Sequence, residues 1–363
     1  MEKNQRLYSY NNLKFLLQIF QFKIKSKSSE YSEQLIMNTL MIKSYEGQKD
    51  WSAIANLFKA CQTVDHLSED ESLADLKLGL SSPNVNPQQD IRLWTDTEDQ
   101  LLGLIGIEPL ASKLVIDGYF GLYIHPSIRS SNLGKEMLRW CETRLREIGQ
   151  QKQQMVQLRT YTLENQSQQN QLLKKQGFKV DRQFITMAKS LESPLSIPQL
   201  PSDFRLSHIQ GKQDISAWVD LFNESFIDHW DHHELTLEQA QYWHNQPNYQ
   251  PELDLVTIAP NGNFAAFCKC QLNSDQIGWI EWLGTRRGFR KLGLGKAMLF
   301  SGLSQLQKAG ATTAKLSVDA DSLTGATKLY ESVGFQPVAN WLSWVKPLSR
   351  QNLSQLFPQQ ATA

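Results

Sequence analysis

The sequence repeats itself over most of its length, and this repeat limits the chain to two similar folding units. The segment IKSYEGQKDWSAIANLF, which begins at Ile42, aligns without gaps with LSHIQGKQDISAWVDLF, which begins at Leu206. Two more matches follow in the same order: IHPSIRSSNLGKEML with TRRGFRKLGLGKAML, and LLKKQGF with LYESVGF. Three ordered matches with slowly changing offsets indicate two homologous halves of about 150 residues each.

A segment rich in proline and serine separates the two halves and predicts the domain boundary. At 363 residues, the chain has room for two domains. We expect an N-terminal domain at 41–189, a linker at 190–203 and a C-terminal domain at 204–348. Residues 1–40 are rich in Lys, Gln, Ser and Asn and are expected to form a poorly ordered extension, and residues 349–363 a tail.

Charge, hydropathy and cysteine content exclude several classes of protein. Lys and Arg together number 37, as do Asp and Glu, whereas a general nucleic-acid binder needs surplus cations. No apolar run reaches about 18 residues, so we expect no membrane span. Of the four cysteines only Cys268 and Cys270 are close, and none has structural zinc spacing. We expect a reduced cytoplasmic monomer or homodimer without metal, nucleic-acid or membrane partners.

The order of elements in the second half is typical of a mixed α/β unit. The apolar runs on either side of the turn at Asn261-Gly262 predict a hairpin. The strands are expected at 255–258, 264–272, 277–283, 314–318 and 335–345, with a helix before and after the fourth. We therefore predict an α/β (α+β) fold with two tandem domains, each a mixed β-sheet flanked by helices.

A glycine-containing loop, RKLGLGKA, lies between an expected strand and helix, from Arg290 to Ala297. Gly293 and Gly295 permit a tight turn with exposed backbone amides, and a helix N-terminus next to them attracts anions. With Lys291 and nearby arginines adding positive charge, phosphate or pyrophosphate is the expected ligand. The string is neither a P-loop nor a full dinucleotide fingerprint. A tight turn with a solvated basic rim is the alternative.

Two motifs then resemble a known family. The string R-x-x-G-x-G, at Arg290, Gly293 and Gly295, resembles the acetyl-coenzyme A loop of the GNAT N-acetyltransferases. The later run SVDADSLTGATKLYESVGF resembles the family's next motif, with Ser322 after a strand and Tyr330 on the next helix. The resemblance covers both halves, and the tandem pair is similar to mycothiol synthase-like two-domain acetyltransferases. It implies acetyl-coenzyme A as cofactor and a small-molecule amine as acceptor.

The resemblance also implies residue roles in the second half. Backbone groups of the strand would bind the pantetheine arm and acetyl carbonyl, and the loop the pyrophosphate. The expected cofactor-binding residues are Leu283, Thr285, Arg290, Lys291, Leu292, Gly293, Leu294, Gly295 and Ser322. Tyr330 is the candidate general acid because a phenol, with a pKa near 10, is close to a thiol. Glu281, between Ile280 and Trp282, is the candidate base. A core tyrosine and a salt-bridged glutamate are the alternatives.

The first half carries an altered copy of this loop, RSSNLG. Asn132 stands where the second copy has Gly293, and Leu173 occupies the position of Tyr330. The first half therefore lacks the proton donor, and we expect the chemistry in the C-terminal half. A second cofactor site, if present, would use Leu122, Ile124, Arg129, Ser130, Asn132, Gly134 and Asn165.

A histidine-rich segment, FIDHWDHHE, follows the first helix of the second half. H-E-x-x-H is absent and no fourth ligand is evident, so a metal site is not expected. In the GNAT resemblance this region forms the acceptor wall, which assigns His229, Trp230 and His233 to a cationic amine substrate. A solvated helix–loop is the alternative.

Three functions compete at this point. The leading one is a small-molecule N-acetyltransferase that works by direct attack of the amine on the thioester. A protein or peptide N-acetyltransferase would need an open acceptor groove, and a non-catalytic acyl-coenzyme A sensor would bind cofactor without turnover. Thiol release from acetyl-coenzyme A over a panel of amines distinguishes the three.

Overall fold

The computed structural model describes residues 40–65, 72–112, 114–129, 132–195, 199–229, 232–273, 276–322 and 325–348. The expected N-terminal extension, apart from its last residue, and the expected C-terminal tail lie outside the described residues. Ser130 and Trp230 also lie outside them.

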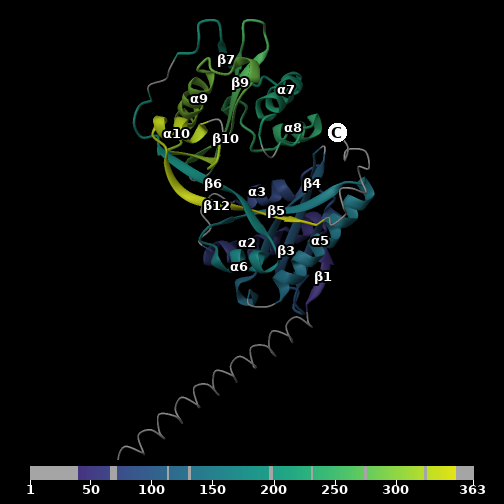
Figure 1. Cartoon of the computed structure of the whole chain (residues 1–363). Coiled ribbons are helices and arrows are strands. Elements are labelled where there is room, and N and C mark those ends of the chain that lie inside the picture. The colour runs from purple at the N-terminus through teal and green to yellow at the C-terminus, as the bar shows by residue number, and fades with distance from the viewer. Residues whose placement is uncertain are drawn as a thin grey trace, which may run out of the picture. The chain divides into compact units, whose positions relative to one another are not determined.

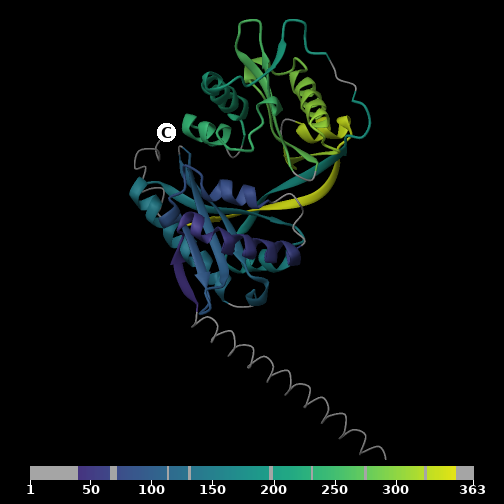
Figure 2. The same cartoon turned by 180° about the vertical axis from the view of Figure 1, so that it is seen from behind.

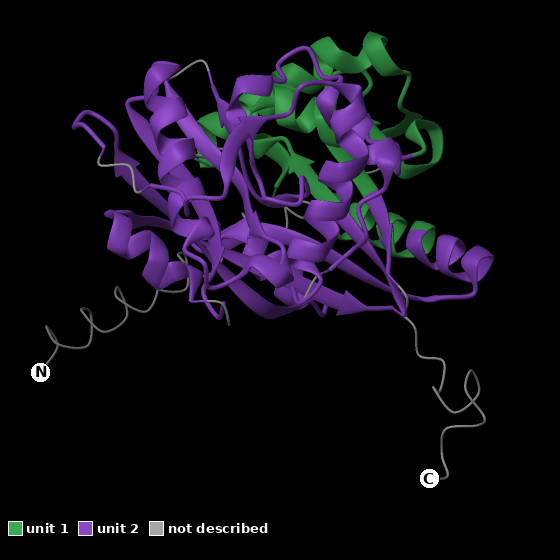
Figure 3. Cartoon of the chain, turned by 90° about the horizontal axis from the view of Figure 1, so that it is seen from above, with its two compact units in different colours: residues 1–80, 86–107, 120–144 green, residues 81–85, 108–119, 145–363 purple. Residues whose placement is uncertain are grey.

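The chain divides into two compact units, which are not the two halves of the repeat (Figure 3). Unit 1 contains residues 1–80, 86–107 and 120–144, and unit 2 contains residues 81–85, 108–119 and 145–363. The division passes through two strands rather than through the proline-rich segment. The domain boundary at 190–203 therefore stays a prediction.

Apart from one extra short helix in the first half, helices and strands follow one another in the same order in both halves of the sequence (Figure 1). The first half consists of β1 (Met41–Ser44), α2 (Trp51–Asp65), α3 (Leu73–Leu80), α4 (Pro87–Asp90), β2 (Ile91–Thr95), β3 (Leu101–Ala111), β4 (Val115–Ile124), α5 (Leu133–Lys152), β5 (Met155–Leu163), α6 (Ser167–Lys175) and β6 (Lys179–Ser190). The second half consists of β7 (Arg205–His208), α7 (Ile215–Phe226), α8 (Leu237–His244), β8 (Asp254–Ile258), β9 (Phe264–Leu272), β10 (Ile277–Thr285), α9 (Leu294–Lys308), β11 (Thr313–Asp319), α10 (Ala326–Val333) and β12 (Gln336–Pro347). The mixed α/β fold is confirmed.

Local sequence explains where several helices begin and end. α8 begins with a capping box, in which Thr236 and Gln239 satisfy each other's backbone amides. α9 begins after Gly293, whose φ of 81° suits glycine, and α10 ends at Gly334 with a φ of 97°.

Unit 1 contains antiparallel strands and the helices that cover them. β1 pairs over its whole length with β2, and β2 pairs with the first part of β3. Ile54 and Leu57 of α2 are buried, as is Leu133 of α5. The first turn after α3 leads into α4, whose Asp90 is 2% exposed and accepts a hydrogen bond from Arg144 Nε at 2.7 Å. This ion pair joins α4 to α5 in the interior of the unit.

In unit 2, strands lie in the order β5-β12-β6-β11-β10-β9-β8-β7, with the first part of β4 beside β5. The β4–β5 and β10–β11 pairs are parallel and the other pairs in this order are antiparallel, so the sheet is mixed as predicted. In the second half of the chain, α9 and α10 lie on one face of β8–β10, and α7 and α8 on the other (Figure 2).

The last strands of the two halves are exchanged. β12, which ends the second half, lies between β5 and β6, with Leu342 opposite Thr162. β6, which ends the first half, lies between β12 and β11, with Val318 opposite Ile185. Figures 1 and 2 show the two long strands side by side. Each half therefore completes the sheet of the other.

Apolar cores form on both faces of the second-half strands. One core joins Leu299 and Leu303 of α9 to Leu316 of β11 and to Tyr330 of α10. The other surrounds Trp218 of α7, on the opposite face. None of the described helices has the length and apolar character needed to cross a membrane.

Candidate active site

The parallel pairing between β10 and β11 stops partway along both strands. It covers Ile277–Ile280 and Thr313–Leu316, although each strand continues beyond these residues. The register with β9 shifts immediately after Ile280, which makes Glu281 the extra residue of a β-bulge. From Glu281 onward, the edge of β10 toward β11 lies outside the ladder. Its backbone groups, including those of Leu283 and Thr285, are thus suited to pair with an extended ligand.

β4 and β5 show the same early end in the first half. Their parallel pairing runs from Val115 opposite Met155 to Tyr119 opposite Arg159, whereas β5 itself continues to Leu163. The duplication has therefore preserved the geometry of the strand pair as well as the order of elements.

The glycine loop follows β10 directly. Lys291 has a φ of 65° and Gly293 a φ of 81°, so the chain reverses sharply before α9. Lys291, Leu292 and Gly293 are exposed, whereas Leu294 is 1% exposed and fixes the start of the helix in the core. Amides of the first turn of α9 follow this exposed rim, which is the arrangement that favours an anion.

The backbone conformation accounts for glycine at position 293 but not at position 295. Its φ is not positive, so the backbone does not require glycine there. A Cβ atom on Gly295 would meet only Thr285 Oγ1, at 3.7 Å, which is an ordinary contact. Neither strain nor packing within the described residues explains the missing side chain, whereas close approach of a ligand does.

We expect Gly295→Val to lower affinity for coenzyme A by roughly tenfold or more, about 1.4 kcal/mol, while the fold survives. The valine side chain would occupy the space in front of the loop amides. Isothermal titration calorimetry measures the affinity and thermal unfolding the fold. Gly288→Val is the matched control, because Gly288 lies in the 3-10 turn Arg287–Phe289 just before the loop and a Cβ there meets nothing within 4 Å. Equal affinity in the two variants would remove the loop from the site.

The guanidinium of Arg290 is engaged within the chain. It donates hydrogen bonds to Thr285 O at 3.3 Å, to Ser225 O at 3.0 Å and to Asp228 Oδ2 at 2.8 Å. Arg287 also pairs with Asp228, and hydrogen bonds from Arg287 and Arg290 hold the pKa of that carboxyl below its usual value. Arg290 thus ties the loop to the end of α7, and its contact with a cofactor stays a prediction.

The first half repeats this attachment. Arg129 Nε donates to Ile124 O at 3.1 Å, as Arg290 Nε does to Thr285 O. Arg129 Nη2 donates to Asp65 Oδ2 at 2.7 Å, at the end of α2. An arginine that ties the loop to the preceding helix is therefore a feature of both copies.

Tyr330 is 8% exposed and packs edge-to-face against Phe335, with ring centroids 6.0 Å apart. Burial raises its pKa to about 12, with a smaller contribution from Cys268. This environment is that of a core tyrosine, which was the alternative to a general acid. It also keeps the hydroxyl protonated. A catalytic role for Tyr330 stays a prediction.

Glu281 stands at the bulge and forms an ion pair with Lys269 of β9. Lys269 Nζ also lies 4.9 Å from the centroid of the Trp282 ring. The Glu281 side chain is 27% exposed and that of Lys269 is 11% exposed. The contacts of Glu281 are thus those of a salt-bridged glutamate, which was the alternative to a catalytic role. The role of Glu281 as general base stays a prediction. No sequence signal identified Lys269, because the contact depends on the register of β9 and β10.

Ser322 is half-buried just after β11, and its amide donates to Asp319 O at 3.1 Å. Asp319, which sequence reasoning missed, is 8% exposed at the end of β11, and Arg182 Nη1 lies 3.6 Å from its Oδ2. Arg182 belongs to β6, so only the strand exchange places it beside the second-half site.

The candidate second cofactor residues are divided between the two units. In unit 1, Leu122 and Gly134 are buried, Asn132 is exposed, and Ile124 O accepts from Cys61 Sγ at 3.4 Å. In unit 2, Asn165 is exposed. Leu173, at the position of Tyr330, is 0% exposed and purely apolar. Cofactor binding in the first half stays a prediction.

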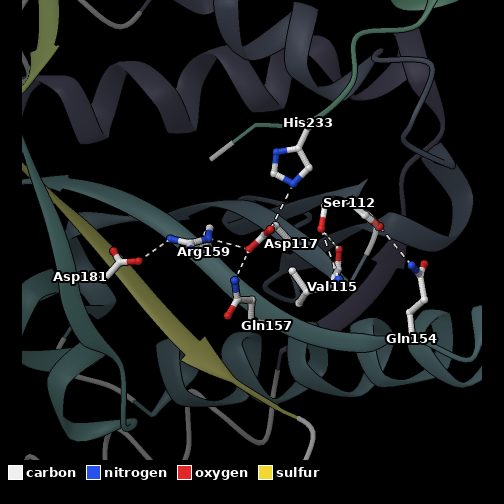
Figure 4. Close-up of polar contacts among 8 residues, drawn as sticks. All are labelled: Ser112, Val115, Asp117, Gln154, Gln157, Arg159, Asp181 and His233. Atoms are coloured by element: carbon white, nitrogen blue, oxygen red, sulfur yellow. Dashed lines mark hydrogen bonds and ion pairs between the residues drawn. The ribbon is translucent and has the colours of Figure 1, made fainter. Parts of the chain in front are cut away.

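His229 and His233 have different environments. His229 is exposed, with its ring 6.1 Å from that of Phe226. His233 Nε2 lies 3.1 Å from Asp117 Oδ2 of β4, and its side chain is 14% exposed (Figure 4). Within the described residues, no group of three or more His, Cys, Asp or Glu side chains is arranged to hold a metal ion.

Comparison with known proteins finds a family model that matches part of the second half. Residues 215–335 match the model of the acetyltransferase (GNAT) family. A mycothiol acetyltransferase from Thermobispora bispora is 30% identical over 155 residues, which cover 41% of this chain and 52% of the relative. The chain thus spans about half the length of this curated relative.

Solved structures share the fold at low sequence identity. A GCN5-related N-acetyltransferase from Sphaerobacter thermophilus superposes with a TM-score of 0.68 and 22% identity, over 86% of this chain and 97% of that one. A tandem GNAT protein from the clavulanic acid biosynthesis pathway gives a TM-score of 0.65 and 11% identity, over 86% of this chain and all of that one. The predicted tandem fold is confirmed.

Proposed function

We propose that this chain, which has the tandem fold, is an N-acetyltransferase of the GNAT family that transfers the acetyl group of acetyl-coenzyme A to the amine of a small molecule. The proposed site lies in the C-terminal half. One observation carries the proposal: the β10–β11 ladder ends at the Glu281 bulge, and β10 then leads into the exposed glycine loop that starts α9. A phosphate-bearing ligand with an extended arm fits this combination.

The residues present fit coenzyme A. The open position at Gly295 and the exposed turn through Lys291 and Gly293 leave room for a pyrophosphate at the start of α9. Backbone groups of Leu283 and Thr285 would hold the pantetheine arm and polarise the acetyl carbonyl. When bound, acetyl-coenzyme A supplies an activated thioester.

Proton handling falls to side chains near the bulge. Tyr330 keeps its proton at neutral pH because burial raises its pKa, and a protonated phenol is the form that can donate to a leaving thiolate. Glu281 would accept a proton from the ammonium form of the acceptor, directly or through water, once its pairing with Lys269 loosens. The attacking amine must be neutral, so this step precedes bond formation.

The relatives support a small acceptor. Their shared name, mycothiol acetyltransferase, specifies a small molecule, and we propose an amine of that size for this chain, in the cytoplasm. The test is thiol release from acetyl-coenzyme A by the full chain over an amino sugar, a polyamine, an amino acid and a peptide α-amine. Turnover of a small amine supports the proposal. Turnover of the peptide alone, or binding without turnover of any amine, would replace it by peptide acetylation or acyl-coenzyme A sensing.

A further inference from the structure

A polar network on β4, β5 and β6 receives His233 from the segment between α7 and α8 (Figure 4). Asp117 Oδ1 accepts hydrogen bonds from Gln157 Nε2 and Arg159 Nε, each at 2.6 Å. Arg159 Nη1 also donates to Asp181 Oδ2 at 2.7 Å. The other oxygen of Asp117 lies 3.1 Å from His233 Nε2. Residues of the first half thus bind a residue of the second.

The network is buried and its charges are matched. The side chain of Asp117 is 5% exposed and that of Arg159 is 8% exposed. Burial alone would raise the pKa of Asp117, but hydrogen bonds from His233, Gln157 and Arg159 hold it below its usual value. Asp117 is therefore a fixed anion, oriented by β5, with one oxygen directed at His233.

The acidic network is not repeated at the matching positions of the second half. There, the parallel pair carries Trp279 of β10 and Lys315 of β11, with Nζ 5.9 Å from the ring centroid. The Asp117 carboxylate thus has no counterpart at the matching position of β10.

The segment that carries His233 is attached to the candidate site at its other end. Asp228, at its start, pairs with Arg287, just before the glycine loop, and with Arg290, the first residue of that loop. At its end, Asn223 of α7 clamps the backbone of Leu235, accepting from its amide at 2.8 Å and donating to its carbonyl at 3.0 Å.

The helices on either side of this segment cover the bulge. Phe222 of α7 and Trp243 of α8 pack on Trp282, with ring centroids 5.4 and 4.8 Å apart. The core of α9 and α10 fills the opposite face of the sheet. The described residues 232–235 lead from the His233 contact into α8, one of the two helices on this face.

We propose that Asp117 and His233 are positioning residues, which fix residues 232–235 as a wall on the acceptor side of the C-terminal site. The inference rests on the proposed function. It gives the first half a task that needs neither a tyrosine at Leu173 nor a bound cofactor. His233 accordingly acts through its contact with Asp117 rather than on the substrate.

The test uses Asp117→Asn and His233→Gln in the full chain, assayed with the small amine that the wild-type chain acetylates. We expect KM for that amine to rise by about tenfold or more, because a displaced wall misplaces the acceptor. KM for acetyl-coenzyme A should stay within about twofold, because Arg290 still ties the glycine loop to the end of α7. The double variant should be no worse than either single variant.

His244→Gln is the matched control. His244 Nε2 lies 3.1 Å from Asp254 Oδ2, the same distance as in the His233–Asp117 pair, but both partners belong to the second half. Losing this contact should lower the unfolding temperature without changing the ratio of the two KM values. A rise of both KM values together in Asp117→Asn, or a loss of stability alone, would overturn the positioning role.

Hydrogen exchange tests the anchoring without an acceptor. Amides of residues 232–236 should exchange faster in Asp117→Asn than in the wild-type chain, and those of α9 should not change. Unchanged exchange at 232–236 would overturn the inference even if acetyl transfer is found. Failure of the proposed function would instead appear as a wild-type chain that releases no thiol.

Discussion

Replacing Tyr330 by phenylalanine is expected to lower kcat by roughly 10²–10⁴ at saturating acetyl-coenzyme A, if the phenol is the general acid. The substitution removes the hydroxyl and keeps the ring, which is 8% exposed and packed on Phe335. Coenzyme A affinity and the unfolding temperature should therefore change little. Steady-state thiol release measures kcat, and calorimetry measures the affinity.

Tyr249→Phe is the control for this substitution. Tyr249 is another partly buried tyrosine of the second half, its ring lies 4.7 Å from that of His244, and its hydroxyl donates to Asp254 Oδ2 at 3.1 Å. Its loss should cost stability while kcat stays near the wild-type value. Near-normal kcat in Tyr330→Phe, with activity lost on altering the loop from Arg129 to Gly134, would move the chemistry to the first half.

The pH profile provides a second check on Tyr330. Burial raises its pKa to about 12, so it should remain protonated, and competent as an acid, throughout the range from pH 7 to 10. Any fall in kcat below pH 10 should therefore come from another group. For stability, the raised pKa gives a contribution fully present below the unfolded value of about 10 and lost as pH rises through about 12. A limb near pH 9 that disappears in Tyr330→Phe would contradict this assignment.

Expressing the C-terminal half alone is expected to abolish cooperative folding. A chain from residue 199 to 363 lacks β6, which pairs with β11 along Thr313–Asp319 and with most of β12. It also lacks β5, the other neighbour of β12. β12 would then lose both of its neighbouring strands, and β11 would lose one. Their unpaired backbone groups favour aggregation over folding. Circular dichroism during thermal unfolding and size-exclusion chromatography measure the outcome.

Co-expression of the two fragments distinguishes the effect of losing β5 and β6 from the effect of breaking the chain. Residues 1–197 and 198–363, produced together, should assemble and unfold with one transition, because the exchanged strands are both present. A single cut in the same segment of the folded chain should likewise leave thiol release intact. A soluble C-terminal fragment that binds coenzyme A without the first half would show that the exchange is not needed.

Much of the second half could be predicted because its signals are local. The apolar run over Phe264–Leu272, the Asn261-Gly262 turn and the glycines around α9 each depend on neighbours a few residues apart. Comparing the sequence with itself also yielded the tandem architecture and the glycine loop. The candidate residues were found in this way, since their motifs are contiguous.

Contacts between distant segments decided the rest. Lys269 beside Glu281, Asp228 beside Arg290 and Asp117 beside His233 each depend on strand register or on the path of a loop. In each case, the sequence predicted a charged or polar candidate but not the partner that holds it. Partners separated by tens of residues leave no periodic signal.

The sequence by itself determined the duplication, the order of elements and the position of the glycine loop. Only the tertiary structure decided which half completes which sheet. β6 and β12 descend from the same repeat and have identical burial patterns along their 12 residues, so by pattern either strand suits either position. The choice lies in the pairing of β12 with β5 and of β6 with β11, contacts that form only when the whole chain folds.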